Sequence, residues 1–249
     1  MKKALIITVA GLSTRFSRSV GKETLKCVYY EKSVEDSILL RLLNHDASFD
    51  RYVIVGGYKF DELKRFADEN LSDRKDKIVL INNEKYAEYG SGYSLYLGLD
   101  YALKEGFDEI VFAEGDLCVD KETFVFLSDC HCDAVSLNRE PIEASKAVIF
   151  YLDADKKVHY LYDLSHTFLK IDEPFTAIYN SAQIWKFSDF KRAMEIFDGM
   201  KENEWHGTNL VFIQKYFGAR DSGSFAFVRF DEWFNCNTVD DFRNSLKKR

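Results

Sequence analysis

The chain has 249 residues, of which 46% are hydrophobic and 30% charged, proportions typical of a globular rather than a disordered protein. Its net charge of −7 argues against nonspecific nucleic-acid binding, so any phosphate site must be a local basic patch. The five cysteines are odd in number and irregularly spaced, which disfavours a disulfide framework. The N-terminal apolar run is too short to span a bilayer, and no later stretch is long enough. We therefore expect a cytoplasmic protein with neither a nucleic acid nor a membrane as partner.

The first half of the chain alternates apolar runs with amphipathic segments. The runs predict buried strands at residues 4–10, 52–55, 78–81 and 109–113. Helical spacing of apolar residues predicts helices at residues 33–44, 60–69 and 91–103, and another beginning near Lys121. A polar loop is expected between the first strand and the first helix. Strands and helices that alternate in this rhythm indicate βαβ units and a parallel sheet.

The second half adds strands without long helices between them. The strands are predicted at residues 147–152, 158–163, 177–184 and 225–230, and the helices at 187–197, 208–216 and 238–248. We expect one α/β domain over residues 1–249, with a mixed, mainly parallel sheet flanked by helices. Residues 1–130 would form a nucleotide-binding half and residues 131–249 an acceptor-binding half.

The loop after the first strand combines a glycine, small hydroxyl side chains and cations. Its candidate ligand-binding residues are Ala10, Gly11, Leu12, Ser13, Arg15 and Lys26. Ligands of open α/β sheets bind beyond the C-terminal ends of the strands, where backbone N–H groups approach phosphates. The loop is neither a Walker loop nor a three-glycine dinucleotide fingerprint. A plain surface loop with solvated cations is the alternative.

Three later segments also fall at predicted strand ends. The first contains Asn83 and then Gly90 and Ser91, which open a helix whose free N–H groups favour anionic or polar ligands. The second contains Glu114 and Asp116, and a carboxylate at such a strand end is well placed to bind Mg²⁺. The third contains Asn237, just before a helix-start signal at Thr238 and Asp241. Ordinary helix capping is the alternative for each segment.

With these residues in order, the chain resembles the GT-A-like nucleotidyltransferase (nucleotide-sugar pyrophosphorylase) family. It is most similar to the bacterial phosphocholine and aminoethylphosphonate cytidylyltransferases. The resemblance rests on the loop with Arg15 and Lys26, on the tyrosine- and glycine-rich segment 83–95, on residues 114–116 and on the closing motif 237–242. Three departures stand out. Leu25 replaces a proline, Asn237 replaces an aspartate, and the loop is poor in glycine.

The resemblance implies a reaction in which a phosphate or phosphonate oxygen of a small acceptor attacks the α-phosphorus of CTP and pyrophosphate leaves. Arg15 would bind the β- and γ-phosphates, and Lys26 would bridge the α-phosphate and the acceptor. Asp116 and Asn237 would hold the cofactor Mg²⁺. Segment 83–95 would border the base and ribose.

The acceptor is the least defined part of this interpretation. An aromatic cage for phosphocholine would draw on Tyr179 and Trp205 with the carboxylate of Glu232. Aminoethylphosphonate, a phosphorylated amino acid such as phosphoglutamine, and a sugar 1-phosphate stay open, as does a homodimer. The alternatives are a sugar-1-phosphate nucleotidyltransferase and a non-catalytic nucleotide-binding domain. A GT-A glycosyltransferase is disfavoured, because the metal strand would usually carry Asp-x-Asp and this chain has Asp116 followed by Leu117 and Cys118.

Overall fold

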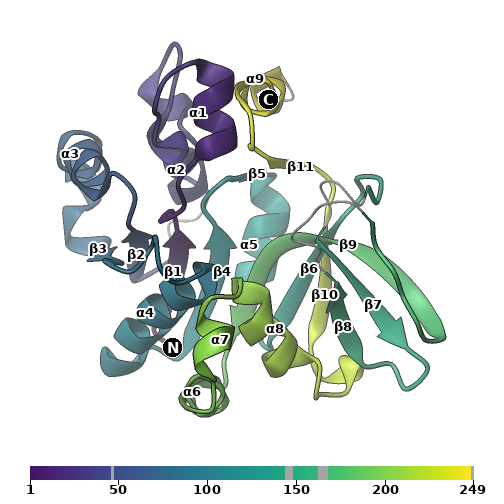
Figure 1. Cartoon of the computed structure of the whole chain (residues 1–249). Coiled ribbons are helices and arrows are strands. Elements are labelled where there is room, and N and C mark those ends of the chain that lie inside the picture. The colour runs from purple at the N-terminus through teal and green to yellow at the C-terminus, as the bar shows by residue number, and fades with distance from the viewer. Residues whose placement is uncertain (46–47, 144–147, 162–167, 248–249) are drawn as a thin grey trace.

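The computed structural model describes residues 1–45, 48–143, 148–161 and 168–247. In this part of the chain a 9-stranded sheet forms the centre of the molecule (Figure 1). Its main path runs β10 (Ala226–Phe230), β6 (Ala134–Asn138), β9 (Phe175–Phe187), β4 (Glu109–Glu114), β1 (Lys3–Thr8), β2 (Arg51–Gly56) and β3 (Ile78–Asn82). β7 (Ile149–Asp153) pairs with β9, and β8 (Val158–Leu161) pairs with β7.

The strand directions confirm a mixed, mainly parallel sheet. β1 runs parallel to β2 and β4, β2 runs parallel to β3, and β6 runs parallel to β10. β9 runs antiparallel to both β4 and β6 and so joins the two parallel groups. The C-terminal ends of β1, β2, β3 and β4 therefore lie along one edge, where ligands of such sheets bind.

Helices cover both faces of the sheet (Figure 1). One face packs against α4 (Ser91–Lys104), α6 (Phe190–Asp198) and α8 (Asn209–Phe217). The other packs against α2 (Ile38–Leu43), α3 (Phe60–Asn70), α5 (Lys121–Asp129) and α9 (Val239–Lys247). Strand β1 shows why both cores form, because Ala4 and Ile6 enter one core while Leu5 and Ile7 enter the other. A strand buried on both faces has to be apolar throughout, as the sequence of β1 is.

Short elements complete the chain. They are α1 (Thr14–Val20), α7 (Glu202–Trp205), the 3-10 turns η1 (Lys26–Val28), η2 (Val34–Asp36), η3 (Ser72–Lys77) and η4 (Ser222–Ser224), and strands β5 (Leu117–Val119) and β11 (Trp233–Asn235). β5 and β11 pair antiparallel. This pair carries the segment after β4 and the segment before α9 to the same edge of the sheet.

The predicted strands and most predicted helices are confirmed, with three corrections. The expected polar loop contains helix α1, which sequence pattern missed because Phe16 is its one buried residue. The helix expected over residues 33–44 is interrupted at Ser37, whose extended backbone (ψ 143°) separates η2 from α2. The helix expected from residue 187 begins at Phe190, since β9 continues to Phe187. The predicted ends at residues 147, 162–163 and 248 lie outside the described residues.

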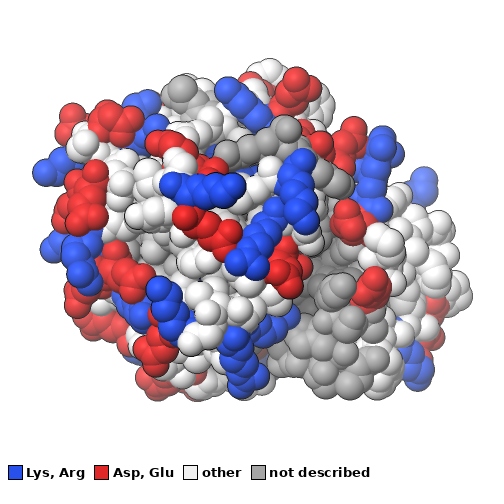
Figure 2. Space-filling view, turned by 90° about the horizontal axis from the view of Figure 1, so that it is seen from above, with Lys and Arg blue, Asp and Glu red and all other residues white. Residues whose placement is uncertain are grey.

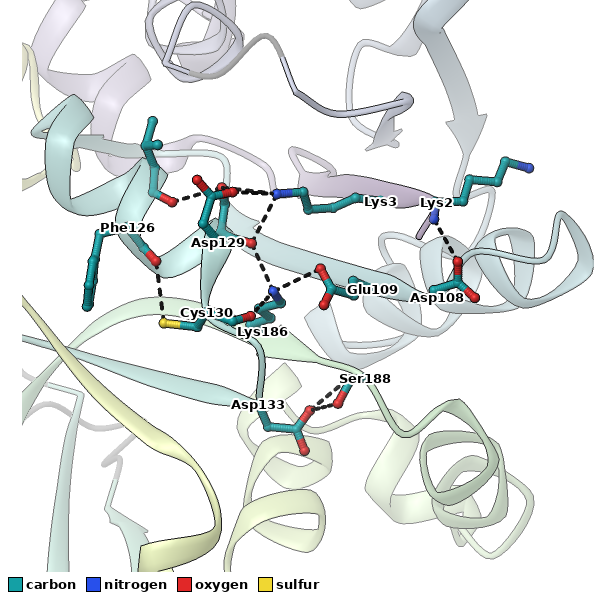
Figure 3. Close-up of polar contacts among 12 residues, drawn as sticks. Lys2, Lys3, Asp108, Glu109, Phe126, Asp129, Cys130, Asp133, Lys186 and Ser188 are labelled. Atoms are coloured by element: carbon teal, nitrogen blue, oxygen red, sulfur yellow. Dashed lines mark hydrogen bonds and ion pairs between the residues drawn. The ribbon is translucent and has the colours of Figure 1, made fainter.

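A buried polar network ties the opposite edge of the sheet together (Figure 3). The side chain of Lys186 in β9 is fully buried, and its Nζ donates to Glu109 Oε2 at 3.0 Å and to the carbonyl oxygen of Ser128 at 2.9 Å. Lys3 donates to the same carbonyl oxygen at 3.1 Å. These contacts link β9, β4, β1 and the end of α5 at the edge where β1 and β4 begin. No helix of the described ranges has both the length and the apolar character needed to cross a membrane.

Candidate nucleotide site

A cleft of about 210 Å³ opens at the C-terminal ends of β1, β3 and β4. Nine of the predicted site residues line it together: Ala10, Gly11, Ser13, Lys26, Asn83, Gly90, Ser91, Glu114 and Asp116. Tyr86, Tyr89, Ser94 and Gly115, which lie in the segments 83–95 and 114–116 of the resemblance, line it as well, and so does Thr8, which was not singled out from the sequence. The strand-end argument thus brings residues from three separate segments to one cavity.

Lys26 and Asp116 form an ion pair in this cleft. The Nζ of Lys26 donates to Oδ2 of Asp116 at 2.6 Å, and the two side chains are only 21% and 16% exposed. Leu25 and Cys27 are buried on either side of Lys26 and fix its place in η1. The other carboxylate oxygen of Asp116, Oδ1, is buried and finds no hydrogen-bond donor in the described part of the chain. Buried carboxylate oxygens are normally hydrogen-bonded, so Asp116 Oδ1 is available to a cation or to a donor that enters the cleft.

Glu114 places a second carboxylate two residues before Asp116. Burial, together with the nearby negative charge of Asp116, raises the pKa of Glu114 from its ordinary value to about 7. Hydrogen bonding from Asn209 and the charge of Lys26 act in the opposite direction. Asn209 Nδ2 donates to Glu114 Oε1 at 2.9 Å. Carboxylates packed this closely are characteristic of ligand sites.

Arg15 lies beside the cleft on α1. Together with Leu12 and Asn237 it lines an adjoining hollow of about 230 Å³, which shares Ser13 and Lys26 with the cleft. Arg15 Nη2 donates to the side-chain oxygen of Asn237 at 2.8 Å. The amide oxygen expected to bind metal is therefore occupied by a guanidinium. Asn237 joins the predicted site, but in contact with the cation of the loop.

The loop backbone before α1 is strained at Ser13. Its φ of 53° lies in the left-handed region, which costs a non-glycine residue about 1 kcal/mol or more. Ser13 Oγ accepts from the backbone N–H of Lys26 at 3.4 Å and so connects the two ends of the loop. This contact holds the backbone of Lys26 close to the loop, and the ion pair with Asp116 holds its ammonium in the cleft.

Asn83 lines the cleft and stabilises the turn before α4 through its side-chain hydrogen bonds. The residue is 1% exposed, its Nδ2 donates to Ser94 Oγ at 2.9 Å, and its Oδ1 accepts from the backbone of Lys85 at 2.9 Å. The side chain therefore holds the turn that precedes α4. This turn sets Gly90 and Ser91 at the wall of the cleft.

The three residues predicted to bind the acceptor do not come together. Tyr179 packs on Phe150 with ring centroids 5.2 Å apart, in the outer part of β9. Trp205 stacks on Phe197 at 5.8 Å beneath α4. Glu232 lines a separate hollow, beside Asp120. These three residues form no common cage, because the two aromatic rings are used in packing between elements.

Charge on the ligand edge is mixed. Figure 2 shows this face from above, with lysines and arginines interspersed among aspartates and glutamates. Positive charge for a phosphate would thus be supplied locally by residues such as Lys26 and Arg15. This agrees with a net charge of −7.

Three solved structures with the same fold carry the names of nucleotide-using enzymes. A putative glucose-1-phosphate thymidylyltransferase from Bacillus anthracis superposes with a TM-score of 0.70 at 14% identity, covering 99% of this chain and 94% of that one. The inositol-1-phosphate CTP transferase from T. maritima superposes with a TM-score of 0.70 at 14% identity, covering 99% of this chain and 96% of that one. The CTP:phosphocholine cytidylyltransferase from Streptococcus pneumoniae gives a TM-score of 0.62 at 14% identity, covering 100% of this chain and 99% of that one. At this identity the likeness establishes the fold.

Comparison by sequence gives the family. No curated protein sequence matches the chain significantly. A family described as a domain of unknown function, DUF6564, matches residues 22–249. Because that match spans most of the sequence, including Lys26, Asp116 and Asn237, the chain belongs to the DUF6564 family.

Proposed function

We propose that this protein is a Mg²⁺-dependent cytidylyltransferase. It transfers CMP from CTP to the phosphate or phosphonate of a small acceptor and releases pyrophosphate. The Lys26–Asp116 pair carries the proposal, since it sets a cation and a carboxylate 2.6 Å apart on the wall of a cleft at the ligand edge. A triphosphate with its metal would separate the pair, with Lys26 turning to the phosphates and Asp116 to the metal.

The residues present fit a magnesium ion with one protein carboxylate. Asp116 Oδ1 is buried and unpaired among the described residues, and Mg²⁺ prefers oxygen ligands. The described residues contain no cluster of three or more His, Cys, Asp or Glu that could hold a metal alone. Mg²⁺ commonly binds through one or two carboxylates plus substrate phosphates, which suits Asp116. When bound, the ion would neutralise charge on the reacting phosphates.

The side chains of the loop would supply the remaining charge neutralisation. An oxygen of the acceptor phosphate attacks the α-phosphorus of CTP while the bond from that phosphorus to the bridging oxygen of pyrophosphate breaks. Lys26 would hold the α-phosphate next to the acceptor phosphate, where negative charge concentrates. Arg15 would leave Asn237 to bind the departing β- and γ-phosphates. Positioning and electrostatics suffice, and no covalent intermediate on the protein is needed.

Of three solved structures with this fold, the putative glucose-1-phosphate thymidylyltransferase fits the alternative of a sugar-1-phosphate nucleotidyltransferase, whereas the names of the two others favour CTP as donor. One is an inositol-1-phosphate CTP transferase and the other a CTP:phosphocholine cytidylyltransferase, so the shared fold accommodates CTP with different phosphorylated acceptors. Residues 1–130 would bind the nucleotide. Residues 131–249 would provide the acceptor side of the cleft. The scattered positions of Tyr179, Trp205 and Glu232 leave phosphocholine without the cage expected from sequence.

A pyrophosphate-release screen tests the proposal. It crosses the four ribonucleoside triphosphates with phosphocholine, aminoethylphosphonate, phosphorylated amino acids and sugar 1-phosphates, with Mg²⁺ and with EDTA. We expect release with CTP, its loss in EDTA, and a fall of at least ~100-fold in Lys26→Ala and Asp116→Ala. Lys22→Ala, an exposed lysine of the same loop, should keep wild-type turnover. Near-wild-type turnover in Lys26→Ala or Asp116→Ala would refute the mechanism, and a preference for UTP or GTP would refute the assignment to CTP.

A further inference from the structure

Residues 205–209 of the second half are clamped onto residues 88–91 of the first. The backbone N–H of Gly90 donates to the carbonyl oxygen of Trp205 at 2.9 Å. A Cβ at Gly90 would lie 1.8 Å from the carbonyl oxygen of Gly207, so the two backbones touch and only glycine fits. The segment that starts α8 thereby packs directly against Gly90 and Ser91, which line the nucleotide cleft.

Asn209, the first residue of α8, contacts two residues of the cleft, Glu114 and Ser91. It is 2% exposed, and its Nδ2 donates to Glu114 Oε1 at 2.9 Å. Its backbone N–H donates to Ser91 Oγ at 3.0 Å, and the Ser91 hydroxyl lies 3.4 Å from Asn209 Oδ1. Both ends of the amide are therefore used to fix neighbours. A buried side chain with this set of contacts determines which way the Glu114 carboxylate points.

The Glu114 carboxylate still has capacity to accept hydrogen bonds. Asn209 is the one donor to it among the described residues, and Oε2 has no donor there. A carboxylate this close to a triphosphate site is electrostatically unfavourable unless a neutral, donor-bearing part of the ligand faces it. Asn209 links Glu114 to Ser91, and Glu114 lines the cleft together with Lys26 and Asp116, where the proposed function puts the phosphates. The part of a nucleotide that joins phosphate to base is the ribose, and its hydroxyls are donors.

We propose that Glu114, oriented by Asn209, accepts hydrogen bonds from the ribose hydroxyls and makes the site selective for ribonucleotides over deoxyribonucleotides. This inference rests on the proposed function. Carboxylates in other nucleotide-binding folds contact ribose hydroxyls in this way. Asn209 is a positioning residue, because it acts on the nucleotide only through Glu114 and Ser91.

The test compares CTP with 2′-deoxy-CTP, by calorimetric binding with Mg²⁺ and by pyrophosphate release. We expect the wild type to prefer CTP by ~10- to 100-fold, the range for hydrogen bonds to a charged group. Glu114→Gln should reduce the preference to less than ~3-fold, mainly by weakening CTP. Asn209→Ala should reduce it partially. Asn203→Ala, an exposed asparagine of α7, should keep the wild-type ratio.

Each outcome bears on the inference. Equal binding of CTP and 2′-deoxy-CTP by the wild type would overturn it, while pyrophosphate release would still support the proposed function. An unchanged ratio in Glu114→Gln, with a higher Mg²⁺ requirement for both nucleotides, would make Glu114 a metal ligand instead. Failure of the wild type to bind either nucleotide would reject the proposed function and this inference together. Should Asn209→Ala not fold, Glu114→Gln decides the matter, since it replaces a single oxygen by an amide nitrogen.

Discussion

Replacing Lys186 with methionine should destabilise the protein strongly. The lysine is fully buried and its ammonium donates to Glu109 and to the carbonyl oxygens of Ser128 and Cys130 (Figure 3). Methionine fills a similar volume but leaves the buried carboxylate of Glu109 without its cation. Ser128 keeps a donor in Lys3, so the uncompensated charge of Glu109 dominates the cost.

The magnitude follows from burial. Removing one partner of a buried ion pair costs about 3–5 kcal/mol of unfolding free energy, whereas replacing both with apolar groups is often nearly neutral. For a chain of this length, we expect the melting temperature to fall by roughly 6–20 °C in Lys186→Met. Lys186→Met combined with Glu109→Leu should be more stable than Lys186→Met alone.

Guanidinium unfolding followed by tryptophan fluorescence and circular dichroism measures these differences. Lys104→Met provides the control, because Lys104 pairs with Asp100 at 2.6 Å but its side chain is 71% exposed. That surface pair should contribute far less to stability than the buried pair, because water screens it. A loss below 1 kcal/mol in Lys186→Met, or a double variant as unstable as the sum of the two single variants, would refute the role assigned to the pair.

Three further predictions concern the site and its surroundings. Because burial raises the folded-state pKa of Glu114 to about 7, wild-type stability is lost as pH rises from about 4.5 to 7. The metal-free Glu114→Gln variant should not show this loss. Urea titrations should therefore find the variant on the order of 3 kcal/mol more stable than the wild type at pH 8 and about equally stable at pH 4.5. A stability difference between variant and wild type that does not depend on pH would contradict the prediction. A Cβ at Gly115 would lie 2.2 Å from Val9 Cγ1, whereas a Cβ at Gly11 would meet nothing within 4 Å. In the same titrations Gly115→Ala should therefore lower the free energy of unfolding by about 1–3 kcal/mol, and Gly11→Ala should leave it almost unchanged. Lys156 has a φ of 58° in an exposed turn, so Lys156→Gly should raise stability by about 0.5–1 kcal/mol, and a lower melting temperature would contradict the strain assigned to it.

The sequence predicts the elements whose pattern is local. Strands β1, β2, β3 and β4 are predicted correctly because short apolar runs in an α/β chain are nearly always buried strands. The predicted capping pair of Thr238 and Asp241 also forms at the start of α9, with hydrogen bonds of 2.7–3.2 Å. β5 and β11 are missed because each has 3 residues and is a strand only through pairing with the other. Helix α1 is missed because it packs against α9, which is far away in the sequence, and because Phe16 is its one buried residue.

For the site, too, the residues that follow a local pattern could be predicted, and those defined by long-range contacts could not. Lys26, Glu114 and Asp116 can be placed because each follows a strand whose end is recognisable, and parallel strand ends meet at one edge. Asn209 cannot, since its partner Glu114 lies 95 positions away and nothing in its own neighbourhood distinguishes it from a helix-start residue. The aromatic residues fail for a different reason. Trp205 is predicted as a ligand contact because it is aromatic, but its ring packs between Tyr96 of α4 and Phe197 of α6.

The contact between Arg15 and Asn237 explains how the chain accommodates one departure from the pattern that it resembles. The residues are 222 positions apart, and the packing of α9 on α1 brings them together, with Val239 donating to Ser19 and Phe242 against Phe16. An aspartate at position 237 would compete with a triphosphate for Arg15, because it carries the same sign of charge. A neutral amide accepts one hydrogen bond from the guanidinium and gives it up more easily to phosphate. The closing motif therefore orients the cation of the loop, and it leaves Asp116 as the carboxylate to which a metal would bind.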